Sequence, residues 1–206
     1  MRTYINCLFL VVVLSGCSNN KAKTESNEKN ASSQIVAPKE EGARIIEEQT
    51  MADTLKGSLR SMAMGTIGTT GITINYYSPA VRGRVIWGGL VPFDNVWVIG
   101  AHRATSIDFN QEVVIGGVTI APGKYALFTI PGKDEWTIII NKNWDQHLAD
   151  KYDQKEDIVR VKVKPGVDDK HQERLRYVVE TESDTKGEIV IFWEKIELSI
   201  PVSSVK

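Results

Sequence analysis

The sequence predicts an all-β protein, an antiparallel β-sandwich of jelly-roll-like character with at most one short helix. Three observations support this fold class. Hydrophobic and polar residues alternate through most of residues 58–202, as they do in strands that bury one face. Turn signals rich in Gly and Pro recur at about the 8–12-residue spacing that is typical of sandwiches and barrels. A folded part of about 145 residues is large enough to form one hydrophobic core without disulfides.

Three of the expected strands follow from strict alternation. Residues 72–77, 159–164 and 196–200 each place an aliphatic or aromatic residue at every second position, with mostly polar residues between them. Successive side chains of a strand point to opposite faces of its sheet. Each of these segments is therefore predicted to have one face in the core and the other in solvent.

Two further segments are predicted from other patterns. Residues 113–120 contain two short apolar runs that flank Gly116 and Gly117, and such a pair supplies the positive φ angles of a tight hairpin turn. Residues 136–140 are apolar at almost every position, which indicates a central strand covered on both faces.

One segment is predicted to be helical, and one to be a loop. Residues 145–153, which hold Leu148 and Tyr152, are the short helix, with Asp145 as its N-cap. The charged stretch 168–171, which includes His171, is expected to be a loop.

The amino-terminal residues 1–16 are predicted to be a signal peptide that is removed. Arg2 gives the positive start, residues 7–14 form an unbroken apolar segment too short to span a membrane, and small residues precede Cys17. The order Leu-Ser-Gly-Cys at 14–17 resembles the lipobox of bacterial lipoproteins. That resemblance implies cleavage before Cys17, acylation of Cys17 and, with Ser18 following, sorting to the outer membrane. The alternative is a secreted protein whose cleavage site merely contains a cysteine.

Residues 17–56 are predicted to be the lipidated cysteine and a polar tether, and 57–206 to be the sandwich domain. The tether is rich in Asn, Ser, Lys and Glu and has too few apolar residues to offset the entropy lost on ordering. After cleavage no free thiol remains, so disulfides and cysteine ligands are excluded. The formal charge of -1 gives no basic field for nucleic acid, and no apolar segment is long enough for a transmembrane helix.

A family resemblance rests on several motifs spread over about residues 65–200. The motifs are YSPAVRGR at 77–84, IWGGLVP at 86–92 and PGKYALFTIP at 122–131. They resemble the bacterial domain-of-unknown-function 2911 family. The resemblance implies an exported lipoprotein of the kind found in Bacteroidetes, and it brings no established activity. Where that family usually has Asn-Glu, this chain has His102-Arg103, and Val98 replaces a usual Arg.

The richest candidate binding segment spans residues 82–105. Guanidinium groups bind carboxylates or phosphates in a bidentate manner, and Trp rings offer flat surfaces to sugars or aromatic ligands. The candidate binding residues are Arg82, Arg84, Trp87, Trp97, His102 and Arg103. The alternative is structural: the two tryptophans lie in the core, and the two Arg-Gly-Arg arginines tie the loop to backbone carbonyls.

Catalytic candidates are weaker. His102 beside Arg103 is a candidate general base, with Asp108 or Asp145 as its acidic partner. The segment 144–147 (Trp-Asp-Gln-His) is a second polar cluster with an aromatic ring. The three histidines lack the spacing of metal ligands, so neither a metal nor another cofactor is predicted.

The sequence therefore favours a non-enzymatic binding module. We expect it to be anchored to the outer membrane through Cys17, on the periplasmic or surface face, and to recognise a small polar or glycan-like ligand or an envelope protein. A hydrolase or isomerase of envelope material that uses His102, and a purely structural component of the envelope, are the alternatives.

Overall fold

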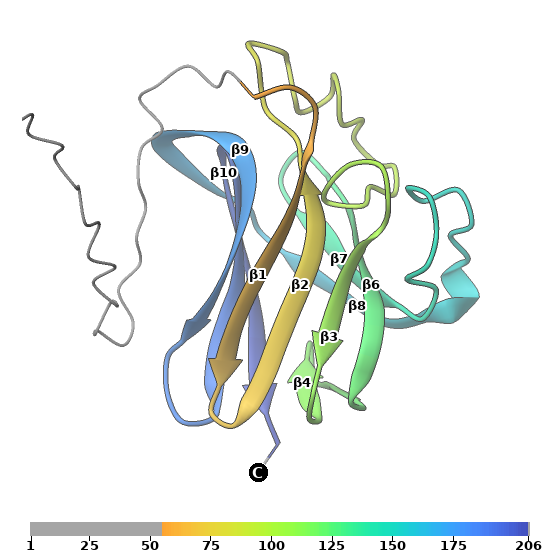
Figure 1. Cartoon of the computed structure of the whole chain (residues 1–206), viewed down its shortest axis with the longest axis vertical. Helices are drawn as coiled ribbons and strands as arrows, with labels where there is room; N and C mark the ends of the chain where they lie inside the picture. Colours follow the sequence, from red (N-terminus) through yellow and green to blue (C-terminus); the bar gives the residue numbers. More distant parts are fainter. Residues whose placement is uncertain (1–54, 206) are drawn as a thin grey trace, which may run out of the picture. The chain divides into compact units, whose positions relative to one another are not determined.

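The computed structural model describes residues 55–205, which form two antiparallel β-sheets packed face to face (Figure 1). The predicted all-β sandwich is therefore confirmed. The predicted signal peptide 1–16, the acylation of Cys17 and nearly all of the predicted tether lie outside the described residues. Within residues 55–205, no helix is long and apolar enough to cross a membrane.

The larger sheet has six strands, most of which pair with their neighbours along the chain. In sheet order these are β1 (Leu59–Ile67), β2 (Thr70–Ser78), β3 (Thr105–Phe109), β6 (Gly123–Ile130), β7 (Trp136–Asn141) and β8 (Asp157–Val163). One excursion interrupts this meander, because the chain crosses to the other sheet between β3 and β6.

The smaller sheet has four strands. In sheet order these are β5 (Val118–Ile120), β4 (Val113–Ile115), β10 (Lys186–Ser204) and β9 (Gly166–Thr181). The predicted hairpin at 113–120 is confirmed as β4 and β5. Gly116 and Gly117 have φ angles of +59° and +80°, so both central turn residues are left-handed, as a type I′ turn requires.

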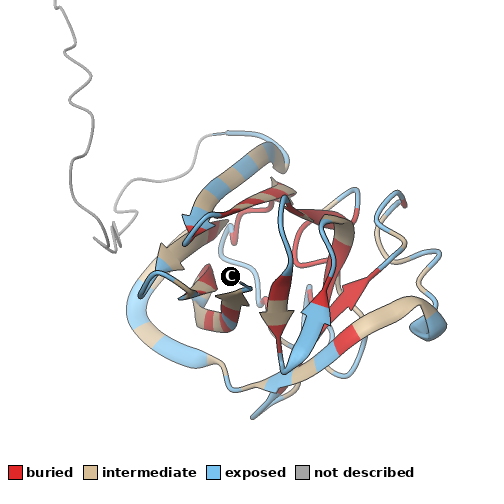
Figure 2. Cartoon of the chain, turned by 90° about the horizontal axis from the view of Figure 1, so that it is seen from below, coloured by how far each residue is buried: buried red, intermediate tan, exposed pale blue. Residues whose placement is uncertain are grey.

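The alternation of the sequence becomes alternation of burial. In β2, Ile72, Ile74 and Tyr76 face the space between the sheets, and the residues between them are half-buried. Figure 2 shows buried residues along the strands, alternating in places with intermediate or exposed ones. The main core is therefore the layer between the two sheets.

Strand β7 is buried at all six positions, as predicted for a strand covered on both faces. Its outward-facing Ile139 belongs to a second, smaller hydrophobic group, the outer cluster. The outer cluster consists of Val98, Ala104, Ala126, Phe128 and Ile139. Residues of two loops, including Val96, Leu148 and Tyr152, pack against it. These loops therefore cover part of the outer face of the six-stranded sheet.

Four tryptophans pack together in the main core. Trp87 and Trp97 come from the long loop between β2 and β3, Trp136 begins β7, and Trp193 lies on β10. Trp97 stacks on Trp193 with 5.5 Å between ring centroids, and Trp87 makes edge contacts with the other three rings at 4.8–5.8 Å. This tryptophan cluster joins the loop to both sheets.

Two local predictions are wrong. Residues 145–153 form turns instead of a helix, and among residues 55–205 the one short helix is the 3₁₀ turn η1 (Gln154–Glu156), which is capped by Asp153. Asp145 caps no helix and instead forms an ion pair with Arg103. The predicted loop at 168–171 is part of β9, an edge strand that carries polar residues on both faces.

Replacing Trp193 by Ala tests the tryptophan cluster. Its side chain is only 2% exposed, so we expect Trp193→Ala to lower the free energy of unfolding by about 3–5 kcal/mol. The matched control is Trp144→Ala, because Trp144 is 38% exposed and should change stability by about 0.5 kcal/mol or less. Denaturant unfolding of both variants, monitored by circular dichroism, gives the two free energies of unfolding. Equal losses in the two variants would contradict this account of the core.

Candidate functional site

A loop of residues 79–104 covers one end of the sandwich, and hydrogen bonds from arginine side chains hold it in place. The Arg84 guanidinium donates hydrogen bonds to the carbonyls of Ala80 (2.6 Å) and Val81 (3.1 Å). Arg82 donates to the carbonyl of Leu55, where the described chain begins. These bonds match the structural alternative for both arginines: each ties a loop to backbone carbonyls.

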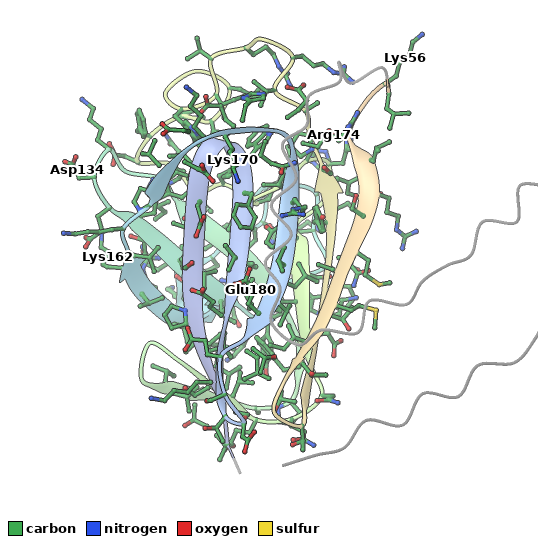
Figure 3. All side chains as sticks on the ribbon, turned by 90° about the vertical axis from the view of Figure 1, so that its left-hand side faces the viewer. Lys56, Asp134, Lys162, Lys170, Arg174 and Glu180 are labelled. Atoms are coloured by element: carbon green, nitrogen blue, oxygen red, sulfur yellow. The ribbon has the colours of Figure 1, made fainter. Side chains whose placement is uncertain are left out.

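Arg174 of β9 fastens the same end of the domain. It is buried, and it donates hydrogen bonds to the carbonyls of Leu55 (2.9 Å), Gly57 (3.2 Å) and Ser78 (2.9 Å). Figure 3 shows Arg174 and Lys56 at this end. The start of the domain, the end of β2 and β9 are thereby held together by one side chain.

The middle of the loop is fixed by the carbonyl of Ile99. This oxygen accepts hydrogen bonds from the Tyr177 hydroxyl (2.7 Å) and the Thr105 hydroxyl (3.1 Å), and Ile99 is fully buried. Ile99 has a left-handed φ of +45°, which is unfavourable for a β-branched residue. The next residue is Gly100, where a Cβ would lie 2.8 Å from the Thr105 hydroxyl oxygen.

The loop then turns onto the outer face of the six-stranded sheet. His102 has a φ of +62°, and its ring lies edge-on to Tyr77 at 5.1 Å. Arg103 forms an ion pair with Asp145 and bridges through its backbone to His147. Leu148, also left-handed at +44°, donates its backbone N–H to the His102 carbonyl (3.1 Å). Backbone strain of this kind is often found at functional sites.

A hollow of about 290 Å³ lies beside these loops. We refer to it as the outer-face hollow. Its lining residues come from β1, β2, β3, β6 and the two loops, and they are Arg60, Asn75, Tyr76, Tyr77, Arg103, Ala104, Ser106, Lys124 and Trp144. The Lys124 ammonium lies 4.2 Å from the centre of the Trp144 ring, a cation–π contact.

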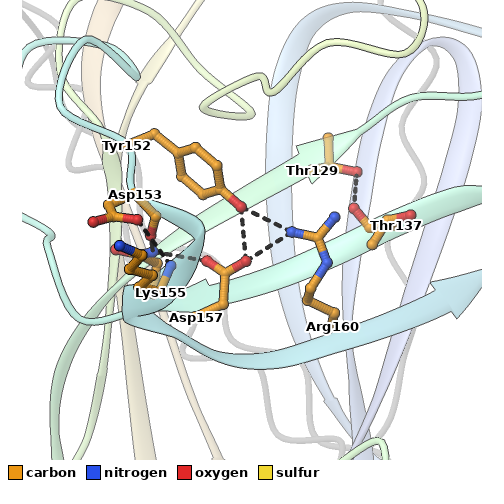
Figure 4. A network of polar contacts seen from close by, with 8 residues as sticks. Thr129, Thr137, Tyr152, Asp153, Lys155, Asp157 and Arg160 are labelled. Carbon is orange, nitrogen blue, oxygen red and sulfur yellow. Dashed lines mark hydrogen bonds and ion pairs between the residues drawn. The ribbon is translucent and has the colours of Figure 1, made fainter.

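A polar network holds the second loop, residues 143–153, against the sheet (Figure 4). The Asp157 carboxylate accepts hydrogen bonds from the Tyr152 hydroxyl (2.7 Å), Arg160 (2.7 Å) and the Asn141 amide (2.7 Å). The hydrogen bond to Asp157 raises the pKa of Arg160. Burial, together with the hydrogen bond and the charge of Asp157, raises the pKa of Tyr152 to about 12. The neutral Tyr152 hydroxyl, which donates to Asp157 and accepts from Arg160 (2.8 Å), therefore attaches the loop that carries Trp144 to β8.

The structure separates the candidate binding residues into two groups. Arg82 and Arg84 serve the closed end of the sandwich, and Trp87 and Trp97 belong to the tryptophan cluster. Arg103 lines the outer-face hollow, and His102 lies at its rim against Tyr77.

Several lining residues were missed by sequence reasoning. Arg60, Asn75, Ser106 and Lys124 are outward-facing residues of separate strands, and alternation alone identifies only their outward orientation. Trp144 is the member of the predicted polar cluster at 144–147 that lines the hollow, where it lies beside Lys124.

The catalytic candidates do not form an acid–base pair. Within residues 55–205, the His102 ring makes no hydrogen bond to a carboxylate. Asp145 is engaged by Arg103, and Asp108 lies opposite Lys124 in the β3–β6 register. The acid–base hypothesis for His102 therefore gains no support from the geometry.

The other two histidines do bind carboxylates. His147 contacts Asp150 at 2.8 Å on the exposed surface, and His171 contacts Glu173 at 2.9 Å. The hollow beside His171 has a volume of about 10 Å³, which suits one water and no substrate. In the part of the chain that the structure describes, no three His, Cys, Asp or Glu side chains could together hold a metal ion.

A comparison with protein families identifies the chain. A family model described as "Protein of unknown function (DUF2911)" matches residues 58–202, from the start of β1 nearly to the end of β10. The chain belongs to the DUF2911 family. The DUF2911 match therefore includes both sheets, both loops and the outer-face hollow. No curated protein and no solved structure matches the chain significantly.

The titration of Tyr152 tests the network around Asp157. Because its pKa is raised, the folded state holds the phenol proton more tightly than the unfolded chain does. This contribution to stability is complete below about pH 10, the ordinary phenol pKa, and is lost as the pH rises towards 12. We expect Tyr152→Phe to remove one late-titrating phenolate from the absorbance titration of the folded protein. Loss of a phenolate that ionises near pH 10 would contradict the network.

Proposed function

We propose that the protein is an envelope lipoprotein whose DUF2911 domain binds a small polar or glycan-like ligand in the outer-face hollow. In this proposal Cys17 carries the lipid that attaches the chain to the outer membrane, and the polar residues after it act as a tether. The domain then serves as a non-enzymatic binding module on the periplasmic or surface face. The geometry at His102 does not favour the hydrolase or isomerase alternative.

One observation carries the binding proposal: a partly exposed aromatic ring stands beside polar groups on a rigid sheet. Trp144 is 38% exposed, and the part of its ring that Lys124 does not cover can pack against a sugar ring. Asn75 and Ser106 are directly opposite each other in the β2–β3 register, and both line the hollow. Their amide and hydroxyl groups are donors and acceptors for ligand hydroxyls. A site on strands is positioned more precisely than one built only on loops.

The contacts that hold the two loops beside the hollow also agree with a preformed site. The loop with Arg103 is fixed through the Ile99 carbonyl, and the loop with Trp144 is fixed through Asp157. The two loops are joined to each other by the Arg103–Asp145 ion pair and by the hydrogen bond from Leu148 to His102. A ligand therefore need not order the hollow on binding, which reduces the entropic cost of association.

Lipid attachment is tested with Cys17→Ser. We expect the unaltered protein to incorporate labelled palmitate and to enter the detergent phase in Triton X-114 partitioning, because acyl chains add apolar surface. The Cys17→Ser variant should do neither. The control is Cys7→Ala, which keeps the apolar segment of the signal and should be lipidated normally. Palmitate labelling that persists in Cys17→Ser would contradict lipid attachment at Cys17.

Ligand binding is tested with Trp144→Ala. The lipidated protein in detergent is screened against a glycan array, and the affinity for any glycan retained is then measured by calorimetry. We expect Trp144→Ala to weaken binding about tenfold, or about 1.4 kcal/mol, with the melting temperature unchanged. The control is Leu90→Ala, an exposed apolar residue outside the hollow. An array without binding, or a Trp144→Ala variant that binds normally, would overturn the proposal.

A further inference from the structure

The charges that line the outer-face hollow are all of one sign. Three of its nine lining residues are cationic (Arg60, Arg103 and Lys124), and none is Asp or Glu. Arg60 comes from β1, Arg103 from the first loop and Lys124 from β6, so the positive groups approach the hollow from three parts of the chain.

Two of these cations have no carboxylate partner. Arg103 is paired with Asp145. Among residues 55–205, Arg60 and Lys124 form no ion pair, and the Lys124 ammonium lies against the Trp144 ring. Asp108 lies opposite Lys124 in the β3–β6 register, but it does not line the hollow. Like charges gathered at one site repel each other and are stabilised when an anion binds between them.

We infer that the ligand of the outer-face hollow is an acidic saccharide, a sugar that bears a carboxylate or a phosphate. This inference rests on the proposed function and specifies its ligand. Arg60 is the group that binds the acid, because a guanidinium forms paired hydrogen bonds to a carboxylate or phosphate. Lys124 adds a second charge, and it is positioned to contact the acid of a sugar packed against Trp144.

The remaining lining groups account for the sugar part of the ligand. Asn75 and Ser106 lie on adjacent strands in the middle of the hollow, where they meet ring hydroxyls. Tyr77, which contacts His102, adds an aromatic edge on the opposite side from Lys124 in sheet order. The volume of about 290 Å³ is at the small end of the range for ligand sites, which suits a single sugar unit of a chain.

The test compares ligands that differ only in charge. Lipidated protein in neutral detergent is titrated calorimetrically with trigalacturonic acid and with its methyl ester, and with galactose 1-phosphate and galactose. We expect each acidic ligand to bind at least about tenfold more tightly than its uncharged counterpart. Raising the salt concentration should weaken the acidic ligands only, because salt screens charge interactions.

Two variants locate the effect. Arg60→Gln and Lys124→Gln should each weaken binding of the acidic ligand about fivefold or more while leaving the weak binding of the uncharged one unchanged. The matched control is Lys162→Gln on β8, a cation of the same sheet that pairs with Glu135 and lies outside the hollow. Circular dichroism and the melting temperature confirm that all three variants fold.

The outcomes separate this inference from the function on which it rests. If the unaltered protein bound acidic and uncharged ligands equally and Trp144→Ala lost this binding, the acidic preference would be overturned. The proposed binding function would still stand. Preference for the acid that persists in Arg60→Gln and Lys124→Gln would overturn the assignment to this hollow. Absence of binding by all four ligands would overturn the inference, while the glycan array decides the wider function independently.

Discussion

The carbonyl oxygen of Ile99 determines where the candidate site lies. A loop of 26 residues closes the end of the sandwich outside any strand, so its backbone groups need partners within the loop or on neighbouring segments. Buried polar groups left without hydrogen bonds are costly. Tyr177 from the far end of the chain and Thr105 from β3 both donate to this oxygen inside the core. Burial raises the pKa of Tyr177 well above its ordinary value, so its hydroxyl remains a donor. His102 and Arg103 follow three and four residues later, so this anchor holds the loop just before it turns onto the outer face.

The sheet that carries the hollow has a different environment on each face. Its inner face packs against β9 and β10 through the main core, and part of its outer face is covered by the two loops. The outer-face hollow begins where this cover ends, next to Ala104. In the proposed function, the inner face of these strands provides stability and the outer face provides recognition. Changes at Arg60 or Lys124 are therefore expected to alter the ligand without disturbing the tryptophan cluster.

Local pattern predicted much of the fold and little of the site. The hairpin at 113–120 and the buried strand at 136–140 were predictable because Gly-Gly turns and apolar runs act within a few residues. The helix predicted at 145–153 does not form, and Asp145, its predicted N-cap, instead pairs with Arg103, 42 residues away in the sequence. The hollow joins Arg60 to Lys124 across four strands, and only the register of those strands brings them together. The spacing of residues in the sequence does not predict that register.

The outer cluster has a consequence for the dynamics of the domain. It is smaller than the main core and lies on the other face of the six-stranded sheet, with Trp97 packed against both clusters. We therefore expect the loop that carries Trp144 to open as a local unit, at a lower free energy than global unfolding. Amide exchange in residues 143–153 would then report the local free energy of opening, while exchange in β7 and β10 reports global unfolding. A ligand that contacts Trp144 binds the closed form of this unit. Occupancy of the hollow would therefore be linked to the folding of a single surface loop.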